Sequence, residues 1–349
     1  MRIQTLQSLR LVFVLLIFLS HFRYGGRGSL YGGGDCGVCF FLILSGFVLS
    51  LGYGQRLREK TFSYGKFYFR RLRKVYPLHL VCFLLFLLLQ WNSLSADSIK
   101  PLLANVLLVQ SWRSNPDYFF SGNSVSWFLS DLLFLYLVFP FVFRFIYWLR
   151  LRSVVIVMSL LIGFYAFVAG NMPSDSVLPD LYIYPPTRLL DFAIGISLSR
   201  FFLLLQERLG KNVSVGNKRF VRNSILECLL IAGLVFLFVI DPTIDEQWGT
   251  AVLFWTWLPV IILSFGLMET AGQGGGFVSQ WLRHPLLLKW GALSFEFYMV
   301  HQLVIRGVLL LLMKLQVQPP YLVVLTVCLM LSALLAGLLH RLLRPVTAS

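Results

Sequence analysis

A basic residue and a histidine bracket the first apolar run of this 349-residue chain. Ten residues separate Arg10 from His21, so in a helix they lie roughly 16 Å apart along the axis. A substrate with an anionic end and a reactive end would bridge them, with Arg10 holding the anion and His21 acting as general base. Alternatively, Arg10 only orients the segment in a bilayer and His21 lies at the interface.

A second candidate is the basic run in FYFRRLRKVYP, residues 67–77. Arg70 and Arg73 lie three positions apart, as do Arg71 and Lys74, so in a helix each pair projects from one face. Either pair is suited to clamping phosphate groups. The alternative is that all four residues only set the topology, but so dense a run exceeds what orientation requires. We expect Pro77, one turn later, to begin the next apolar span.

Ionisable residues also interrupt later apolar runs, where they are costly and therefore candidates for function. Glu296 and His301 are five positions apart and do not share a helix face. We expect one to face a cavity and the other to bond to a neighbouring helix. Asp131 also needs a partner, and so do Arg188 and Asp191. For Arg188 and Asp191, a structural ion pair between helices is as good an interpretation as catalysis.

The elements that must position these residues are membrane helices. The chain is 58% hydrophobic and 13% charged, far more apolar than a soluble core requires. Its net charge of +15 does not indicate nucleic acid binding, because the basic residues cluster between apolar runs. Runs long enough to cross a bilayer number about ten, near 8–22, 37–53, 75–91, 127–147, 153–170, 187–205, 223–240, 249–267, 290–313 and 321–342.

This pattern predicts an all-α integral membrane bundle forming a single domain over residues 1–349. With both termini cytoplasmic, the inner segments carry 22 of the 30 Lys and Arg residues, as the positive-inside rule requires. The segment 101–112 is too short to span and is expected to be an interfacial or re-entrant helix. We expect no fused soluble domain and a retained first span.

The five cysteines do not indicate a metal site. Cys36 and Cys39 form a CxxC, but no second pair exists, so a metal or redox interpretation is weak. No metal and no tightly bound cofactor are expected.

Six blocks, in this order and spacing, resemble the membrane acyltransferase-3 family across the whole chain: IQTLQSLRLVFVLLIFLSHF, GVCFFLILSGFVLS, FYFRRLRKVYPLHL, SVSWFLSDLLFLYLVFP, YPPTRLLDFAIGI and GALSFEFYMVHQLVI. The resemblance implies a ten-span enzyme of the inner (plasma) membrane. Such enzymes move an acyl group, commonly acetyl from acetyl-CoA, onto a polysaccharide, oligosaccharide or lipid-linked glycan. Many members carry a fused esterase-like domain, so this chain would be of the standalone type.

The resemblance also implies roles for particular residues. Arg10 and His21 match the family pattern of a basic residue, ten residues and a histidine. The RxxR motif that handles CoA matches Arg70 to Arg73 or, in the other register, Arg71 and Lys74. Many members have Glu where this chain has Asp131, which leaves the role of that position open.

The mechanism expected from these residues is general-base acyl transfer. His21 removes the proton of an acceptor hydroxyl, which attacks the thioester of acyl-CoA. The sequence does not show which group stabilises the oxyanion, and His301, Arg188 and a backbone amide are the candidates. An acyl-enzyme ranks lower, since no Ser or Cys has an evident paired base. The main alternative is a proton-coupled secondary transporter, disfavoured by the lack of broken spans in matching halves. A glycosyltransferase or polymerase would be expected to have a larger outer loop.

Overall fold

Helices make up nearly all of the regular structure in the computed structural model, which describes residues 3–90, 94–209, 217–270 and 274–348. In these ranges no strand occurs apart from an isolated bridge between Tyr24 and Arg27. The long helices are α1 (Gln4–His21), α2 (Gly33–Arg58), α3 (Tyr64–Gln90), α6 (Trp127–Tyr147), α7 (Leu151–Gly170), α9 (Pro185–Leu209), α10 (Asn217–Ile240), α12 (Leu258–Thr270), α15 (Ser294–Leu315) and α16 (Tyr321–Ala348).

Shorter helices connect or extend them: α4 (Ile99–Val106), α5 (Pro116–Phe119), α8 (Ser174–Ser176), α11 (Glu246–Ala251), α13 (Phe277–Leu282) and α14 (Pro285–Ala292). Single turns include η4 (Ser124–Ser126) and η7 (Leu253–Thr256), and η5 (Val177–Ile183) is a seven-residue π-helix. In the described residues ten helical segments are long and apolar enough to cross a membrane. The predicted all-α membrane bundle of about ten spans is therefore confirmed.

Some predicted boundaries are wrong. α3 begins at Tyr64 and continues through Pro77, so Pro77 does not begin the span and the whole basic run is part of the helix. Membrane helices tolerate such a proline because other groups satisfy the freed carbonyl. The ninth span begins at Ser294 because α14 ends at Ala292 and forms a separate helix. The segment 101–112 is too short to span, as predicted, since α4 ends at Val106.

Two apolar cores lie on either side of a shared group of helices. One joins α1 and α2 to α3, α6, α15 and α16, and the other joins them to α7, α10 and α12. α9 contributes to both cores and packs tightly on α2 through two glycines. A Cβ atom at Gly46 would collide with the carbonyl of Phe192, and one at Gly195 with that of Ile43. Small residues of this kind let membrane helices approach closely.

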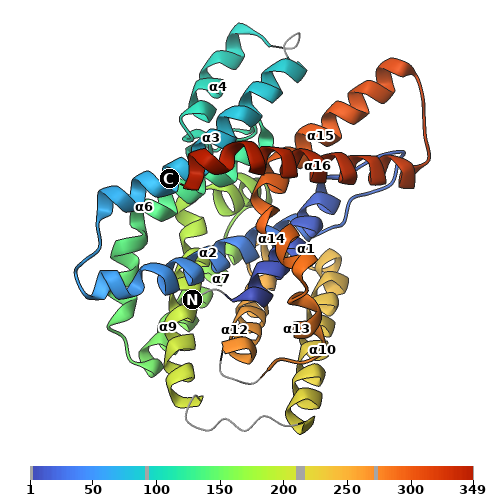
Figure 1. The fold of residues 1–349 in the computed structure, drawn as a ribbon. Helices are drawn as coiled ribbons and strands as arrows, with labels where there is room; N and C mark the ends of the chain where they lie inside the picture. Colours follow the sequence, from blue (N-terminus) through green and yellow to red (C-terminus); the bar gives the residue numbers. More distant parts are fainter. Residues whose placement is uncertain (1–2, 91–93, 210–216, 271–273, 349) are drawn as a thin grey trace.

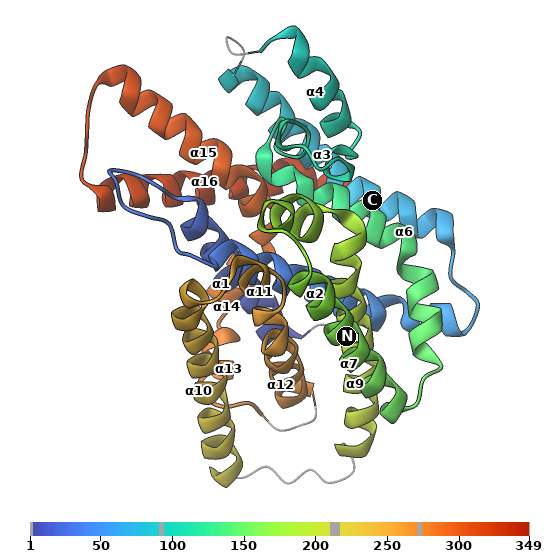
Figure 2. The same ribbon diagram turned by 180° about the vertical axis from the view of Figure 1, so that it is seen from behind.

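Two pairs of connections lie on opposite sides of the bundle (Figures 1 and 2). The α2–α3 and α6–α7 connections lie on one side, while the α1–α2 and α15–α16 connections lie together on the other. On that second side, Tyr24 donates a hydrogen bond to the carbonyl of Pro319 (3.0 Å) and Arg27 lies 5.1 Å from the centre of the Tyr321 ring. The end of α1, which carries His21, is therefore held against the α15–α16 turn.

Candidate active site

The two histidines singled out from the sequence are hydrogen-bonded to each other. His21, the last residue of α1, and His301 of α15 approach to 2.9 Å between Nδ1 and Nε2. His301 Nδ1 lies 2.6 Å from the carbonyl oxygen of Tyr298. A carbonyl only accepts, so His301 Nδ1 carries a proton and, in the neutral ring, Nε2 accepts. His21 then donates from Nδ1, which leaves its Nε2 as an unprotonated acceptor.

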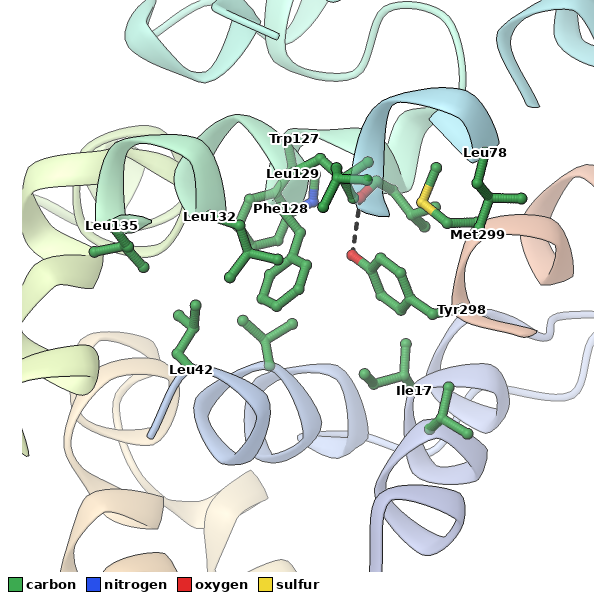
Figure 3. Close-up of a cluster of buried hydrophobic side chains, with 14 of the residues drawn as sticks. Ile17, Leu42, Leu78, Trp127, Phe128, Leu129, Leu132, Leu135, Tyr298 and Met299 are labelled. Atoms are coloured by element: carbon green, nitrogen blue, oxygen red, sulfur yellow. Dashed lines mark hydrogen bonds between the residues drawn. The ribbon is translucent and has the colours of Figure 1, made fainter. Parts of the chain in front are cut away.

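Neighbouring segments hold the α15 turn that carries His301. Tyr298 donates a hydrogen bond to the carbonyl of Val125 (2.9 Å), drawn in Figure 3, and Asn123 donates one to the carbonyl of Met299 (2.8 Å). The rings of Tyr298 and Phe128 pack edge to face, with their centres 5.4 Å apart, above residues of α1 and α2 (Figure 3). These contacts connect the histidine pair to the start of α6.

A cavity of about 240 Å³ lies between α1, α2, α3, α6 and α15. Its walls are mostly apolar, and three of the predicted cations, Arg10, Arg71 and Lys74, line it together. Tyr298 also lines it, and the Tyr298 ring lies 5.8 Å from that of His301. The cavity thus extends from a cationic region to the side chain that borders the histidine pair.

The phase of α3 distinguishes the two possible registers of the basic run. Arg71, Lys74 and Val75 share one helix face and line the cavity, whereas Arg70 is exposed and lies outside the described lining. Arg73 is also outside that lining and lies 5.9 Å from the Phe69 ring.

Arg71 is held by aromatic side chains. It donates a hydrogen bond to the hydroxyl of Tyr53 (2.8 Å), and its guanidinium lies 5.3 Å from the Tyr53 ring and 5.9 Å from the Tyr136 ring. Cation–π contacts of this kind orient a guanidinium and leave other N–H groups free to donate. Arg71 is therefore positioned toward the cavity before any ligand arrives.

Glu296 lies near the cations of the cavity and does not contact the His21–His301 pair. It interacts electrostatically with Arg10 and Lys74, and one carboxylate oxygen lies 2.8 Å from Nδ1 of His340 on α16. Arg10 Nε is buried without a hydrogen-bond partner among the described residues. Glu296 and His301 thus both bond to neighbouring helices, and neither is among the described lining residues of the cavity. The expectation that one of them faces a cavity is not confirmed.

Arg188 and Asp131 belong to a different, fully buried polar cluster. Arg188 Nε lies 3.3 Å from a carboxylate oxygen of Asp191, and Trp255 donates to the other oxygen at 2.5 Å. Arg188 thus forms a buried ion pair, which favours the structural interpretation over the catalytic one. The pair lies within α9 and does not join two helices, contrary to expectation. Asp131 is 0% exposed, interacts electrostatically with Arg188 and does not line the cavity.

The same cluster contains a tyrosine whose burial and partner the sequence does not indicate. Tyr182, in η5, is hydrogen-bonded to Asp35 at the start of α2. Burial raises the pKa of the Tyr182 hydroxyl well above its ordinary value, and the neighbouring Asp35 carboxylate raises this pKa further. Tyr182 therefore remains protonated at neutral pH and donates to Asp35. Nothing in its local sequence marks it, because Asp35 is nearly 150 residues away.

Arg306 was also missed, although a sequence signal existed. It is a cation in the ninth apolar run, five residues after His301, and such residues are costly in a membrane. Its side chain donates to the hydroxyl of Ser124 at 2.6 Å and is close enough to interact electrostatically with His21. Of the two cations on α15, Arg306 is the nearer in sequence to His301.

Comparison with known proteins adds an independent finding. A family model described as "Acyltransferase domain" matches residues 3–340. A protein named acyltransferase MdmB, from Streptomyces mycarofaciens, is 28% identical over 290 residues, which cover 78% of this chain and 68% of the relative. No solved structure matches the chain.

Proposed function

As a member of the acyltransferase-3 family, this multi-pass membrane protein is an acyltransferase, and we propose that it transfers an acyl group, acetyl in the first instance, from acyl-CoA to a carbohydrate hydroxyl. The acceptor is a polysaccharide, oligosaccharide or lipid-linked glycan of the cell envelope. The enzyme lies in the inner (plasma) membrane, with the basic α2–α3 side facing the cytoplasm, in accord with the positive-inside rule.

One observation carries the proposal. Arg10, Arg71 and Lys74 line a single cavity whose lining also includes Tyr298, the neighbour of the His21–His301 pair. A cavity of about 240 Å³ suits the acyl-pantetheine end of the donor but is smaller than a typical pocket for a whole ligand of that size. The phosphates of CoA would therefore remain near Arg71 and Lys74, while the thioester extends toward His21.

In the proposed reaction, Nε2 of His21 takes the proton of the acceptor hydroxyl as its oxygen attacks the thioester carbonyl. The C–S bond breaks as the new C–O bond is completed, and the imidazolium returns its proton to the sulfur of CoA. His301 fixes the tautomer of His21, a role that resembles the positioning residue of a catalytic triad. This use of both ring nitrogens makes His301 a poor candidate for stabilising the oxyanion.

Arg306 is the better candidate for that task, since its positive charge acts on His21 and its guanidinium has N–H donors besides the one that bonds to Ser124. Arg188 is less suitable because it is already paired with Asp191. Asp131, which does not itself line the cavity although its neighbour Leu132 does, is assigned a supporting role in the buried cluster.

The test is turnover of radiolabelled acetyl-CoA by the purified protein in nanodiscs. We expect His21→Ala to lower kcat by roughly 10²–10⁴-fold, the usual contribution of a general base. Arg71→Ala should raise KM by roughly ten- to a hundredfold, as expected for a lost hydrogen bond to a charged group.

Arg70→Ala is the matched control, because it removes the same charge one position away, outside the cavity. Its kinetics should resemble those of the unmodified chain. Equal effects of Arg70→Ala and Arg71→Ala would contradict the assigned donor site, and full activity of His21→Ala would contradict its role as base.

A further inference from the structure

A second cavity, of about 270 Å³, lies between the C-terminal parts of α2, α6 and α9. It shares Leu51 with the donor cavity but is otherwise lined by different residues. Two arginines, Arg58 of α2 and Arg200 of α9, line it from different helices, and Tyr147 of α6 lies between them. The mechanism proposed above uses none of these three residues.

Tyr147 holds both arginines in place. The guanidinium of Arg58 lies 4.8 Å from the centre of the Tyr147 ring and that of Arg200 lies 4.9 Å from it. Arg58 also donates to the Tyr147 hydroxyl at 3.1 Å, and Arg200 donates to the carbonyl of Leu149 at 3.4 Å. A guanidinium has five N–H donors, so these bonds leave others to meet a ligand.

The charge of this cavity is not balanced locally. No Asp or Glu occurs among its described lining residues, whereas both arginines are always protonated. A neighbouring carboxylate, Glu59, accepts a hydrogen bond from Gln55 at 2.9 Å, at the edge of the cavity. Two guanidinium groups held on one ring without a carboxylate between them favour a bound anion, and phosphate oxygens match their donor geometry.

The surroundings indicate where that phosphate comes from. The same turns of α6 that line the cavity also expose Phe145 (68%) and Trp148 (79%). Tryptophan is enriched at the membrane–water interface, so Trp148 indicates that this end of α6 lies at the level of lipid headgroups. Basic pockets between membrane helices on the cytoplasmic side bind anionic headgroups.

We infer that the cavity lined by Arg58, Tyr147 and Arg200 binds an organic phosphate, and specifically the headgroup of an anionic phospholipid. The other available source of the same chemistry is the nucleotide end of CoA, whose proposed site lies in the first cavity. The lipid would bridge α2, α6 and α9 where the α2–α9 contact ends. This inference does not depend on the identity of the acyl acceptor.

The test is native mass spectrometry of the purified full chain after addition of phosphatidylglycerol or, separately, of phosphatidylcholine. We expect the double variant Arg58→Gln/Arg200→Gln to weaken binding of phosphatidylglycerol by roughly tenfold, with weak binding of phosphatidylcholine unchanged. The control Arg56→Gln/Arg152→Gln removes the same charge from two exposed arginines outside the cavity. It should retain the lipid.

A second variant keeps both charges and guards against general misfolding. Tyr147→Leu removes the ring that orients the arginines and should also weaken binding of phosphatidylglycerol, while the protein remains monodisperse. Equal losses in the cavity and control variants, or no loss in either, would overturn the inference. If Arg58→Gln/Arg200→Gln retains the lipid but raises KM for acetyl-CoA, the phosphate is that of CoA and the lipid assignment is wrong.

Discussion

At the scale of single residues, the hydrogen-bond chain from the Tyr298 carbonyl through His301 to His21 has a chemical consequence. The carbonyl fixes the proton of His301, His301 fixes that of His21, and the far nitrogen of His21 remains basic. A lone imidazole at a helix end would exchange between tautomers and rotate. The second histidine removes that freedom without adding a charge.

We therefore predict that His301→Ala lowers kcat by roughly a hundredfold, because the base loses its orientation. KM for acetyl-CoA should stay within about twofold, because the donor site is intact. Steady-state kinetics of the purified variant give both parameters. The control is His284→Ala, which removes an exposed histidine at the start of α14. A rise in KM without a fall in kcat would show that His301 acts on donor binding instead.

The neighbouring arginines differ for a reason that is also local. Arg70 and Arg71 have the same chemistry, but the helix turns by about 100° between them. Only Arg71 then meets Tyr53 and the cavity. Side chains of one type in adjacent positions thus acquire different roles from helix phase alone.

At the scale of elements, the α2–α9 pair connects the two apolar cores. Its glycines allow the backbones to approach until a Cβ atom no longer fits. The pair also forms two walls of the second cavity, which opens beyond the point where the glycines bring the helices together. The distance between α2 and α9 therefore affects both the packing of the bundle and the shape of that cavity.

Gly46→Ala should destabilise the protein by about 2 kcal/mol, because the added methyl collides with the Phe192 carbonyl and α9 must move. Thermal unfolding of the detergent-solubilised protein would measure the change. Gly52→Ala, on the same helix, introduces the same methyl where no atom lies within 4 Å. It should leave the unfolding temperature unchanged or slightly higher, since alanine favours the helix. Similar losses in both variants would contradict the close-packing argument.

At the scale of the whole molecule, the distribution of charge and of connections predicts an orientation. An even number of spans puts both ends of the chain on one side, and the basic α2–α3 and α6–α7 connections lie together on one side of the bundle. The end of α1 with His21 lies on the opposite side, beside the α15–α16 turn. The donor cations and the base would then be reached from opposite surfaces of the membrane.

Cysteine labelling tests this orientation. Introduced into a Cys228→Ser background, Gly28→Cys should react with a membrane-impermeant maleimide in intact cells. Lys60→Cys should react only after permeabilisation. The remaining cysteines are buried and give little background. The reverse pattern would place Arg71 and Lys74 outside, where cytoplasmic CoA could not reach them.

Much of the architecture could be predicted because it depends on local properties of the chain. Apolar runs of sufficient length must become helices in lipid, since no water is present to satisfy backbone groups. The ten spans and the ionisable residues within them were therefore visible without a structure. The boundaries were less accurate where helix and span differ, as in α3, whose polar first turns extend beyond the apolar run.

The contacts between distant residues were decided only by the tertiary structure. His21 and His301 are 280 positions apart, and no local pattern indicates that the end of α1 meets the second turn of α15. Likewise, the sequence alone left the pair Arg70 and Arg73 equivalent to the pair Arg71 and Lys74. The structure separates them because the packing of Phe67, Val75 and Leu78 in the core sets the rotation of α3 about its axis. Hydropathy does not encode that rotation, since it reports only whether a segment enters the membrane.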